Sequence, residues 1–306
     1  MNDINQKTVD EKAESSRIYS LFYSFFLIPL MIVVFGILFY LLFAVITEEP
    51  TDINQLLIKL ETGSIRDKAN ASYRMNTLFY NDPSIYNSSY RERIIKIHNM
   101  SKSELLSDNT LRMHTIMIMG NSADTTFGRV LIDELYSDNE EFRIKAIEAL
   151  GKLKYANSSS SIKKFLEKEN SFLEKLAATG SLGNIGNKEV VPDLVSLINR
   201  WPSKWLDSDG PELRWEAALA LLKMNYTDLN TQKIINNLLT RSYYNSYSEL
   251  DENTVNFVIL KILNILNSIE DKNLLIPFFE KLNFLSENDP NLEIRNFAKK
   301  SLKTIQ

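Results

Sequence analysis

The chain has 306 residues, with 35 basic and 39 acidic side chains and a formal net charge of −4. It contains no cysteine, which excludes disulfide bonds, thiol catalysis and cysteine metal sites. A nearly neutral, slightly acidic chain lacks the basic face that general nucleic-acid binding requires, so no nucleic-acid partner is expected.

A polar tail of mixed charge over residues 1–18 is followed by an uncharged, mostly apolar run over residues 21–46. A helix of that length spans about 39 Å, more than the ~30 Å hydrocarbon core of a bilayer. The sequence therefore predicts a transmembrane helix over residues 19–46 and a solenoid domain over residues 47–306. Pro29 is expected to kink the membrane helix near its start.

A cleaved signal peptide is the alternative interpretation of this run. Its apolar region would be about 7–15 residues long and end at a small-x-small site, and the sequence has neither feature. Lys7, Lys12 and Arg17 precede the run, whereas Lys59 is the only basic residue within 47–61. The positive-inside tendency predicts a cytoplasmic N-terminus and an exported C-terminal domain. The abundance of Asn, Ile, Lys and Ser is typical of an AT-rich bacterial genome. Together with the single apolar run, this composition predicts a single-pass protein of the bacterial cytoplasmic membrane.

One pattern recurs after the apolar run: an apolar helix, a short polar turn, and a second helix that opens with an apolar residue and usually an arginine. The clearest copy has a first helix over residues 130–136 and a second over residues 141–151. Asp138 precedes this second helix at the spacing of a capping box. Ala146 and Ala149 are small, so they would let neighbouring helices approach closely.

The second helices are predicted to open at positions 66, 112, 143, 173, 214, 256 and 295. The spacings between these positions are 46, 31, 30, 41, 42 and 39 residues. Solenoids built from helix pairs have repeats of about 30–47 residues. Strand patterns are scarce. The predicted fold class is therefore all-α, with a single transmembrane helix followed by an α-solenoid of about six or seven helix pairs.

The motif Phe142-Arg143…Ala146…Ala149-Leu150-Gly151 and its copies resemble the HEAT repeat family, including the short bacterial form called HEAT-like or PBS-lyase-like repeats. The resemblance covers roughly residues 52–306, and the arginine is kept at positions 66, 112, 143, 214 and 295. It implies an armadillo-like, right-handed superhelix of antiparallel helix pairs that serves mostly as a scaffold and protein-binding surface. It implies no specific activity.

Gly180, Gly183 and Gly186 have the spacing of a phosphate-binding loop, but such a loop follows a strand and opens a helix. These glycines instead close a predicted helix, where a left-handed glycine is expected. Residues 207–212 resemble part of a calcium loop but lack its third acidic ligand, so a turn with Pro211 at the first helical position is preferred. No cofactor, metal site or small-molecule substrate is predicted.

Aromatic residues gather in the turns of two neighbouring repeats. The candidates for protein binding are Trp201 and Trp205 in one extended turn, and Tyr243, Tyr244 and Tyr247 in the equivalent turn of the next repeat. Equivalent turns of adjacent repeats lie about 10 Å apart on one edge, so these residues could form an aromatic edge. The alternative is that they fold back and fill a packing gap. Trp215, inside a second helix, is expected in the core.

The leading functional hypothesis is a membrane-tethered adaptor, anchored through residues 19–46, whose solenoid binds a protein partner. Tethering raises the effective concentration of membrane neighbours, so a modest affinity suffices. The alternatives are a HEAT-like enzyme or enzyme-accessory protein, by analogy with chromophore lyases, and a nucleic-acid-binding solenoid. His98 and His114, the two histidines, form no metal or triad pattern, and His114 is expected as a hydrogen-bonded core residue. The chain is therefore not predicted to be an enzyme.

Overall fold

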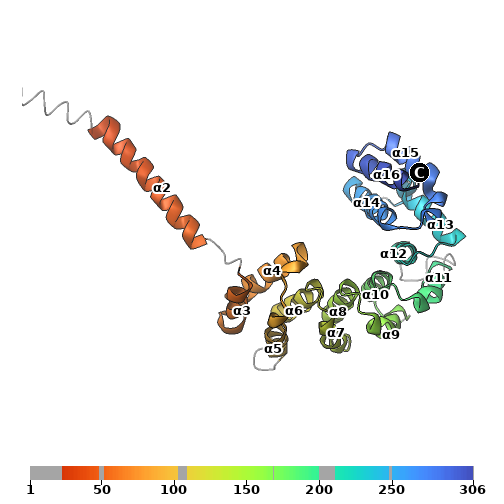
Figure 1. Cartoon of the computed structure of the whole chain (residues 1–306), viewed down its shortest axis with the longest axis horizontal. Helices are drawn as coiled ribbons and strands as arrows, with labels where there is room; N and C mark the ends of the chain where they lie inside the picture. Colours follow the sequence, from red (N-terminus) through yellow and green to blue (C-terminus); the bar gives the residue numbers. More distant parts are fainter. Residues whose placement is uncertain are drawn as a thin grey trace, which may run out of the picture. The chain divides into compact units, whose positions relative to one another are not determined.

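The computed structural model describes residues 23–47, 52–102, 109–167, 169–199, 211–247 and 250–305. The chain divides into two compact units, Met1–Gln55 and Leu56–Gln306. The first unit contains one long apolar helix, and the second consists of helices arranged in pairs (Figure 1). Every regular element within the described ranges is a helix, so the all-α class predicted from the sequence is confirmed.

The apolar helix α2 (Ile28–Thr47) follows a π-helical turn, η1 (Tyr23–Leu27). The stretch Phe25–Leu42 has a mean hydropathy of 2.8 and none of it is buried against other described residues. Length and composition allow this helix to cross a membrane, and a signal sequence near an N-terminus has the same two properties. Residues 19–22, where the sequence places the start of the helix, lie outside the described residues.

The π-helical turn lies directly before Pro29, the second residue of α2. Proline has no N–H, and its ring clashes with the carbonyl group four residues earlier, so a helix that contains it must widen or bend. Single π-helical turns are one way in which a helix absorbs such a change. The kink expected at Pro29 stays a prediction, and the backbone directly before α2 is π-helical.

The second unit is a row of helix pairs, each with a first and a second helix. The first helices are α3 (Ile53–Thr62), α5 (Arg91–Ser101), α7 (Gly128–Glu134), α9 (Ser159–Lys163), α11 (Val191–Asn199), α13 (Leu229–Leu238) and α15 (Phe279–Asn288). The second helices are α4 (Ile65–Asn81), α6 (Asn109–Asn121), α8 (Glu140–Lys152), α10 (Phe172–Ile185), α12 (Pro211–Lys223), α14 (Glu252–Ser268) and α16 (Leu292–Ile305). All seven second helices predicted from the sequence are present in the described ranges.

The second helices stack on one another in chain order, from α4 to α16. Within this unit they lie along the inner side of the row, and the first helices lie along its outer side (Figure 1). The core is the apolar layer between the two sets, where Leu57, Phe79, Leu150 and Leu221 are fully buried. The row therefore presents one continuous inner face that is built from second helices.

Three glycines allow the second helices to approach closely. A Cβ atom would lie 2.7 Å from Ala149 Cα if placed at Gly120, 2.8 Å from Ser181 Cα at Gly151, and 2.6 Å from Ala220 Cα at Gly183. The same contact thus recurs at the α6–α8, α8–α10 and α10–α12 interfaces. Because a larger residue would hold the backbones apart, these glycines and their small partners set the helix spacing.

The helix boundaries follow local chemistry, with one correction. The predicted N-cap of α8, Asp138, is wrong: Asn139 is the cap, and its side chain accepts a hydrogen bond from the Glu141 N–H at 2.8 Å. An Asn oxygen readily bonds the N–H two residues ahead, so the cap moves one residue closer to the helix. Gly186 ends α10 in the left-handed region at φ 76°, and Pro211 begins α12, both as predicted.

Candidate interaction surface

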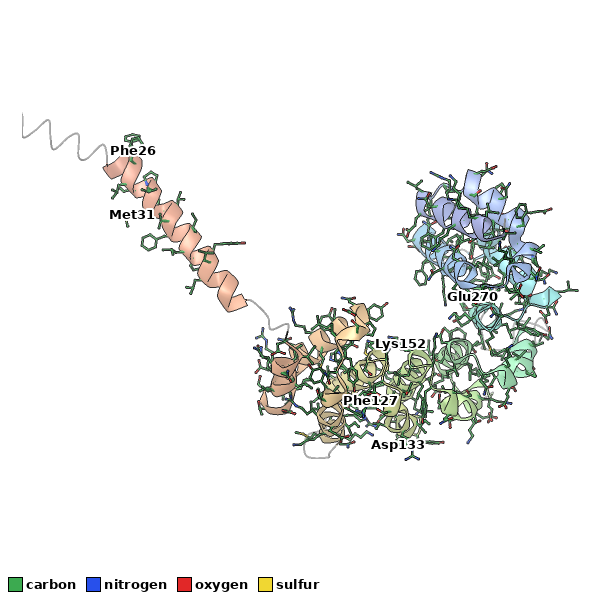
Figure 2. All side chains as sticks on the ribbon, in the orientation of Figure 1. Phe26, Met31, Phe127, Asp133, Lys152 and Glu270 are labelled. Atoms are coloured by element: carbon green, nitrogen blue, oxygen red, sulfur yellow. The ribbon has the colours of Figure 1, made fainter. Side chains whose placement is uncertain are left out.

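Polar side chains on the inner face connect neighbouring second helices. Asn121 of α6 donates a hydrogen bond to Asn76 of α4 at 2.7 Å and accepts one from Lys152 of α8 at 2.9 Å. Lys152 Nζ also lies 5.2 Å from the centre of the Tyr80 ring of α4. Lys152 therefore reaches back across α6 to α4, on the inner side of the row (Figure 2).

A similar arrangement recurs two second helices further along the chain. Lys223 of α12 donates to Asn184 of α10 at 2.8 Å, and Glu216 of α12 pairs with Lys261 of α14 at 2.6 Å. Lys152 and Lys223 are each the last residue of their helix. A cation at this position is favoured by the partial negative charge of a helix C-terminus.

The inner face is aromatic and exposed at α4. Tyr73 and Tyr80 lie seven residues apart on one face of this helix and are 65% and 66% exposed. The Tyr73 ring is 6.4 Å from the ring of His114 on α6. His114 is half-buried rather than in the core, and its Nδ1 lies 2.6 Å from the hydroxyl oxygen of buried Ser72. Exposed tyrosines of this kind are favoured anchors for a protein partner.

The arginine of the repeat motif stabilises the turn before the second helix. Arg143 Nη1 donates to the backbone carbonyl groups six and five residues before it, at 2.7 and 3.0 Å. Arg295 Nη1 contacts the carbonyl groups at the same two positions of its own turn. Each arginine thus satisfies two acceptors that the helix cannot reach. In these two copies the motif arginine therefore stabilises the turn, whereas Arg112 pairs with Glu134.

A buried charged cluster joins the second and third helix pairs. Glu134 of α7 is fully buried, and its carboxylate accepts hydrogen bonds from Arg112 Nε at 3.1 Å and from Arg112 Nη2 at 2.9 Å. His98 Nε2 lies 3.0 Å from the same carboxylate, and Lys102 also pairs with it. Burial alone would raise the pKa of Glu134, but the hydrogen bonds and charges of His98 and Lys102 lower it to about 2. Glu134 is therefore ionised and paired.

The sequence gives one indication of this cluster, a charged residue at an apolar position of its helix. Glu134 lies three residues after Leu131 and directly before Leu135, so it falls on the apolar face of its helix. A charged residue on such a face has to find partners because an unpaired buried charge is costly. The identity of those partners, which come from α5 and α6, depends on tertiary packing.

His98 is a fully buried histidine held from both sides. Its Nδ1 lies 2.8 Å from the Thr115 hydroxyl oxygen, and that hydroxyl also lies 2.8 Å from the Arg112 carbonyl oxygen. A neutral His98 that donates from Nε2 to Glu134 keeps Nδ1 as an acceptor, and the Thr115 hydroxyl has to turn from the Arg112 carbonyl to donate to it. Burial lowers the pKa of His98, as does the charge of Lys102, while the hydrogen bond to Glu134 opposes both. His98 is thus a structural residue, hydrogen-bonded in the core.

The lowered pKa of His98 predicts a loss of stability in mild acid. Below about pH 6.5 the unfolded chain takes up a proton that the folded protein resists, so the free energy of unfolding should decrease. One such group changes the free energy of unfolding by at most about 1.4 kcal/mol per pH unit. Denaturant unfolding of His98→Gln between pH 7.5 and 5.5 should give a flatter pH dependence than the wild type. An equal slope in the variant and the wild type would contradict this assignment.

The tyrosines predicted as a binding edge pack around Trp215. Ring centroids of Tyr243 and Tyr244 lie 6.2 Å from that of Trp215, and Tyr247 lies 5.2 Å from it. Tyr244 is buried, and its hydroxyl donates to the Leu238 carbonyl oxygen at 2.6 Å. Burial raises the pKa of Tyr244. Tyr244 therefore has a packing role and Trp215 is in the core as expected, whereas partner binding by half-buried Tyr243 and Tyr247 stays a prediction.

The other half of the predicted aromatic edge lies outside the described residues. Trp201 and Trp205 fall in this part of the chain, as do residues 207–210 of the calcium-like segment. The η8 helix (Arg241–Ser246) does lie between α13 and α14, where the sequence places the tyrosine turn. Within the described ranges, no group of three or more His, Asp or Glu side chains is arranged to hold a metal ion.

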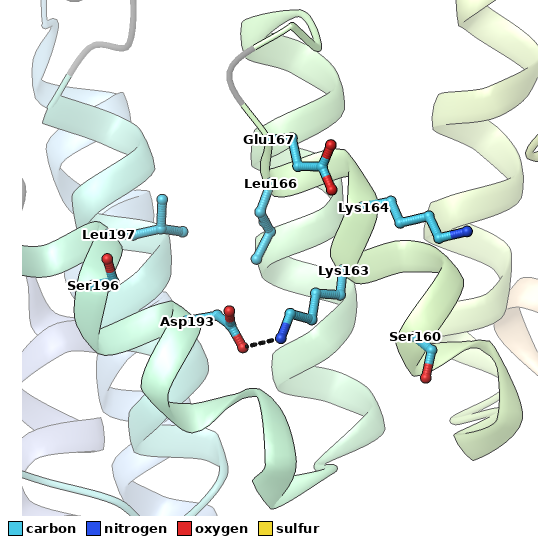
Figure 3. Close-up of a pocket in the computed structure, with 8 residues that line it drawn as sticks. All are labelled: Ser160, Lys163, Lys164, Leu166, Glu167, Asp193, Ser196 and Leu197. Carbon is cyan, nitrogen blue, oxygen red and sulfur yellow. Dashed lines mark ion pairs between the residues drawn. The ribbon is translucent and has the colours of Figure 1, made fainter.

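An open pocket of about 340 Å³ lies between α9 and α11 on the outer side of the row (Figure 3). Leu166 and Leu197 line it, and Lys163 and Asp193 form an ion pair across it at 2.8 Å. The pocket is a groove between successive first helices, where α9 has only five residues. Lys164 and Glu167 also line the groove, so it is polar as well as open.

Comparisons with known proteins agree with this architecture. A family model described as HEAT repeats matches residues 128–206. A similar solved structure is the complex of CpcE and CpcF of phycocyanin lyase from Nostoc sp. PCC7120, at 12% identity and TM-score 0.54, covering 85% of this chain and 97% of that chain. Another is the archaeal HEAT-like repeats protein from Thermococcus onnurineus NA1, at 17% identity and TM-score 0.38, covering 84% and 98%.

No curated protein matches the sequence. At 12% identity the likeness to the phycocyanin lyase complex concerns the fold alone. The family match covers the α7–α8 and α9–α10 pairs and α11, and it includes the Phe142 to Gly151 copy of the motif. Residues 128–206 therefore match HEAT repeats, and the second unit has a HEAT-like helical-repeat fold.

Proposed function

We propose that the chain is a membrane-anchored scaffold or adaptor that binds a protein partner through the inner face of its solenoid. The observation that carries this proposal is the pairing of an uncovered apolar helix with a row of repeats. Phe25–Leu42 is apolar enough to enter a bilayer, and the repeats expose aromatic and charged side chains on one long face. A repeat row of this kind is well suited to hold an extended partner.

Sequence asymmetry supports an orientation for this anchor. Lys7, Lys12 and Arg17 precede the apolar helix, and Lys59 alone lies in residues 47–61. This asymmetry supports a cytoplasmic N-terminus in a bacterial cell, with the repeats on the far side of its membrane. We assign no catalytic role to the chain, because no arrangement described above forms a recognisable catalytic constellation.

The first part of the test uses tags at both ends of the full-length chain in bacterial cells. The protein should stay in the membrane fraction after high-salt washing and dissolve only with detergent. Both tags should remain on one polypeptide, and protease added to spheroplasts should remove the C-terminal tag. Loss of the N-terminal tag during biogenesis would identify a cleaved signal. Full protection of the C-terminal tag would reverse the orientation.

The second part tests partner binding in the same membranes. A photo-crosslinking amino acid in place of Tyr80, on the inner face, should capture one defined protein. The control position is Tyr136, which is 68% exposed and follows α7, next to a small depression that includes Phe165. Capture at Tyr136 with none at Tyr80 would reject the inner face as the binding surface. No capture at any exposed position of the repeats would reject the adaptor role.

A further inference from the structure

We infer that the inner face of α8, α10 and α12 binds an extended acidic segment of the protein partner, with Lys152 and Lys223 each taking a carboxylate. This inference rests on the proposed function, and it adds the chemistry by which the partner is recognised. Three observations carry it: the unbalanced charge of the two lysines, their environment and their spacing.

The charge on this face is unbalanced at two positions. Lys145 pairs with Glu148 at 2.9 Å, and Lys261 pairs with Glu216 at 2.6 Å, so these four side chains neutralise one another. Lys152 and Lys223 instead bond to amide oxygens of Asn121 and Asn184. Within the described ranges neither lysine forms an ion pair. The carboxylates near them, Glu148 and Glu216, already pair with Lys145 and Lys261, so these four lysines and two glutamates keep a net charge of +2.

The environment of these lysines favours an anionic ligand. Burial lowers the pKa of Lys223, and the positive charge of Lys261 lowers it further, while Glu216 opposes both. A partly desolvated ammonium group that has only an amide partner gains more from a carboxylate than one in free solvent does. The amide oxygens also hold the two ammonium groups in place, which reduces the entropy lost when a ligand binds.

The spacing of the lysines fits an extended chain. Packed helices lie 8–10 Å apart, so equivalent residues of α8 and α12 are about 16–20 Å apart. An extended segment rises about 3.3 Å per residue, so acidic groups about five or six residues apart would reach both lysines. On α10, which lies between the lysines, the Glu216 carboxylate of α12 lies over Gly180, and Lys261 neutralises that carboxylate.

The test uses the full chain in detergent and a fluorescent peptide, Glu-Glu-Ser-Gly-Ser-Gly-Glu-Glu, as the probe. Binding measured by anisotropy should weaken at least tenfold in the double variant Lys152→Gln, Lys223→Gln, and it should weaken with added salt. The matched control Lys188→Gln, Lys272→Gln removes two exposed lysines outside this face and should bind like the wild type. Equal binding by the two double variants would overturn the inference.

Two further results separate this inference from the proposed function. A peptide with lysine in place of every glutamate should not bind, and single-stranded DNA of similar length should bind less tightly than the acidic peptide. Tighter binding of DNA would overturn a protein ligand for this face. If the acidic peptide fails but a partner still crosslinks at Tyr80, the inference is wrong and the adaptor role stands. If the peptide binds and no partner crosslinks anywhere, the adaptor role fails.

Discussion

Replacing Glu134 with alanine should lower the free energy of unfolding by about 3–5 kcal/mol, the usual cost of removing one partner from a buried ion pair. The side chain is fully buried and accepts from three cationic or neutral donors on α5 and α6. Without it, His98 loses the acceptor for its Nε2–H, and Lys102 and Arg112, only 29% and 21% exposed, lose their counter-charge. Denaturant unfolding of the full chain in detergent, followed by circular dichroism, measures this loss.

The control for this prediction is the neighbouring exposed residue, Asp133→Ala, which should change the free energy of unfolding by no more than about 0.5 kcal/mol. The pH dependence gives a second readout. Because the pKa of Glu134 is lowered from 4.5 to about 2, its contribution is complete above pH 4.5 and is lost as the pH falls toward 2. The Glu134→Ala variant should therefore lose less stability over that interval than the wild type. Similar losses in Glu134→Ala and Asp133→Ala would show that the cluster does not hold the helices together.

The repeat architecture is readable from sequence because each second helix carries a local signal. An apolar opening residue, small residues one or two turns later and a closing glycine all act within one helix, as in the Phe142 to Gly151 copy. The first helices are less regular, and α9, which has five residues and is followed by a 3₁₀ turn (Lys164–Leu166), has no such signal. Short helices are held by packing against their neighbours, so their limits depend on contacts that the local sequence does not contain.

The candidate surface was less predictable for the same physical reason. The tyrosine turn is correctly located between α13 and α14, but nothing local shows that Tyr244 turns inward to bond the Leu238 carbonyl. That outcome depends on Trp215 of the preceding second helix, whose ring fills the same space. Likewise, Lys152 and Lys223 look like ordinary helix-terminal lysines in the sequence. Their lack of a carboxylate partner becomes visible only when neighbouring repeats are stacked.

The amide contacts and the glycine contacts act on the same interfaces. Gly183 of α10 approaches Ala220 of α12, and Asn184, the next residue, accepts from Lys223. In the same way, Gly120 of α6 approaches Ala149 of α8, and Asn121 accepts from Lys152. The close approach of the backbones therefore brings each lysine within reach of its amide partner. A change that separates the helices should weaken the inner face as well as the core.

Replacing Gly183 with alanine tests whether the close approach of α10 and α12 stabilises the row. It should lower the free energy of unfolding by about 1–3 kcal/mol, the usual cost of overpacking. The new Cβ would lie 2.6 Å from both Ala220 Cα and Ala220 Cβ, so the backbones of α10 and α12 would have to separate. The expected loss is net of the gain of up to about 1 kcal/mol that alanine brings to a helix interior. Denaturant unfolding measures it under the conditions used for Glu134→Ala.

Gly180→Ala is the matched control, because it makes the same change on the same helix. There the new Cβ would meet the Glu216 carboxylate oxygen at 2.9 Å, and that flexible side-chain end can move aside. Only the helix-propensity gain remains, so Gly180→Ala should be neutral or raise the free energy of unfolding by up to about 1 kcal/mol. Opposite signs for these two substitutions would tie the stability of the row to the Gly183–Ala220 contact. Equal effects would mean that helix spacing is set elsewhere, since the two variants differ only in what their Cβ atoms meet.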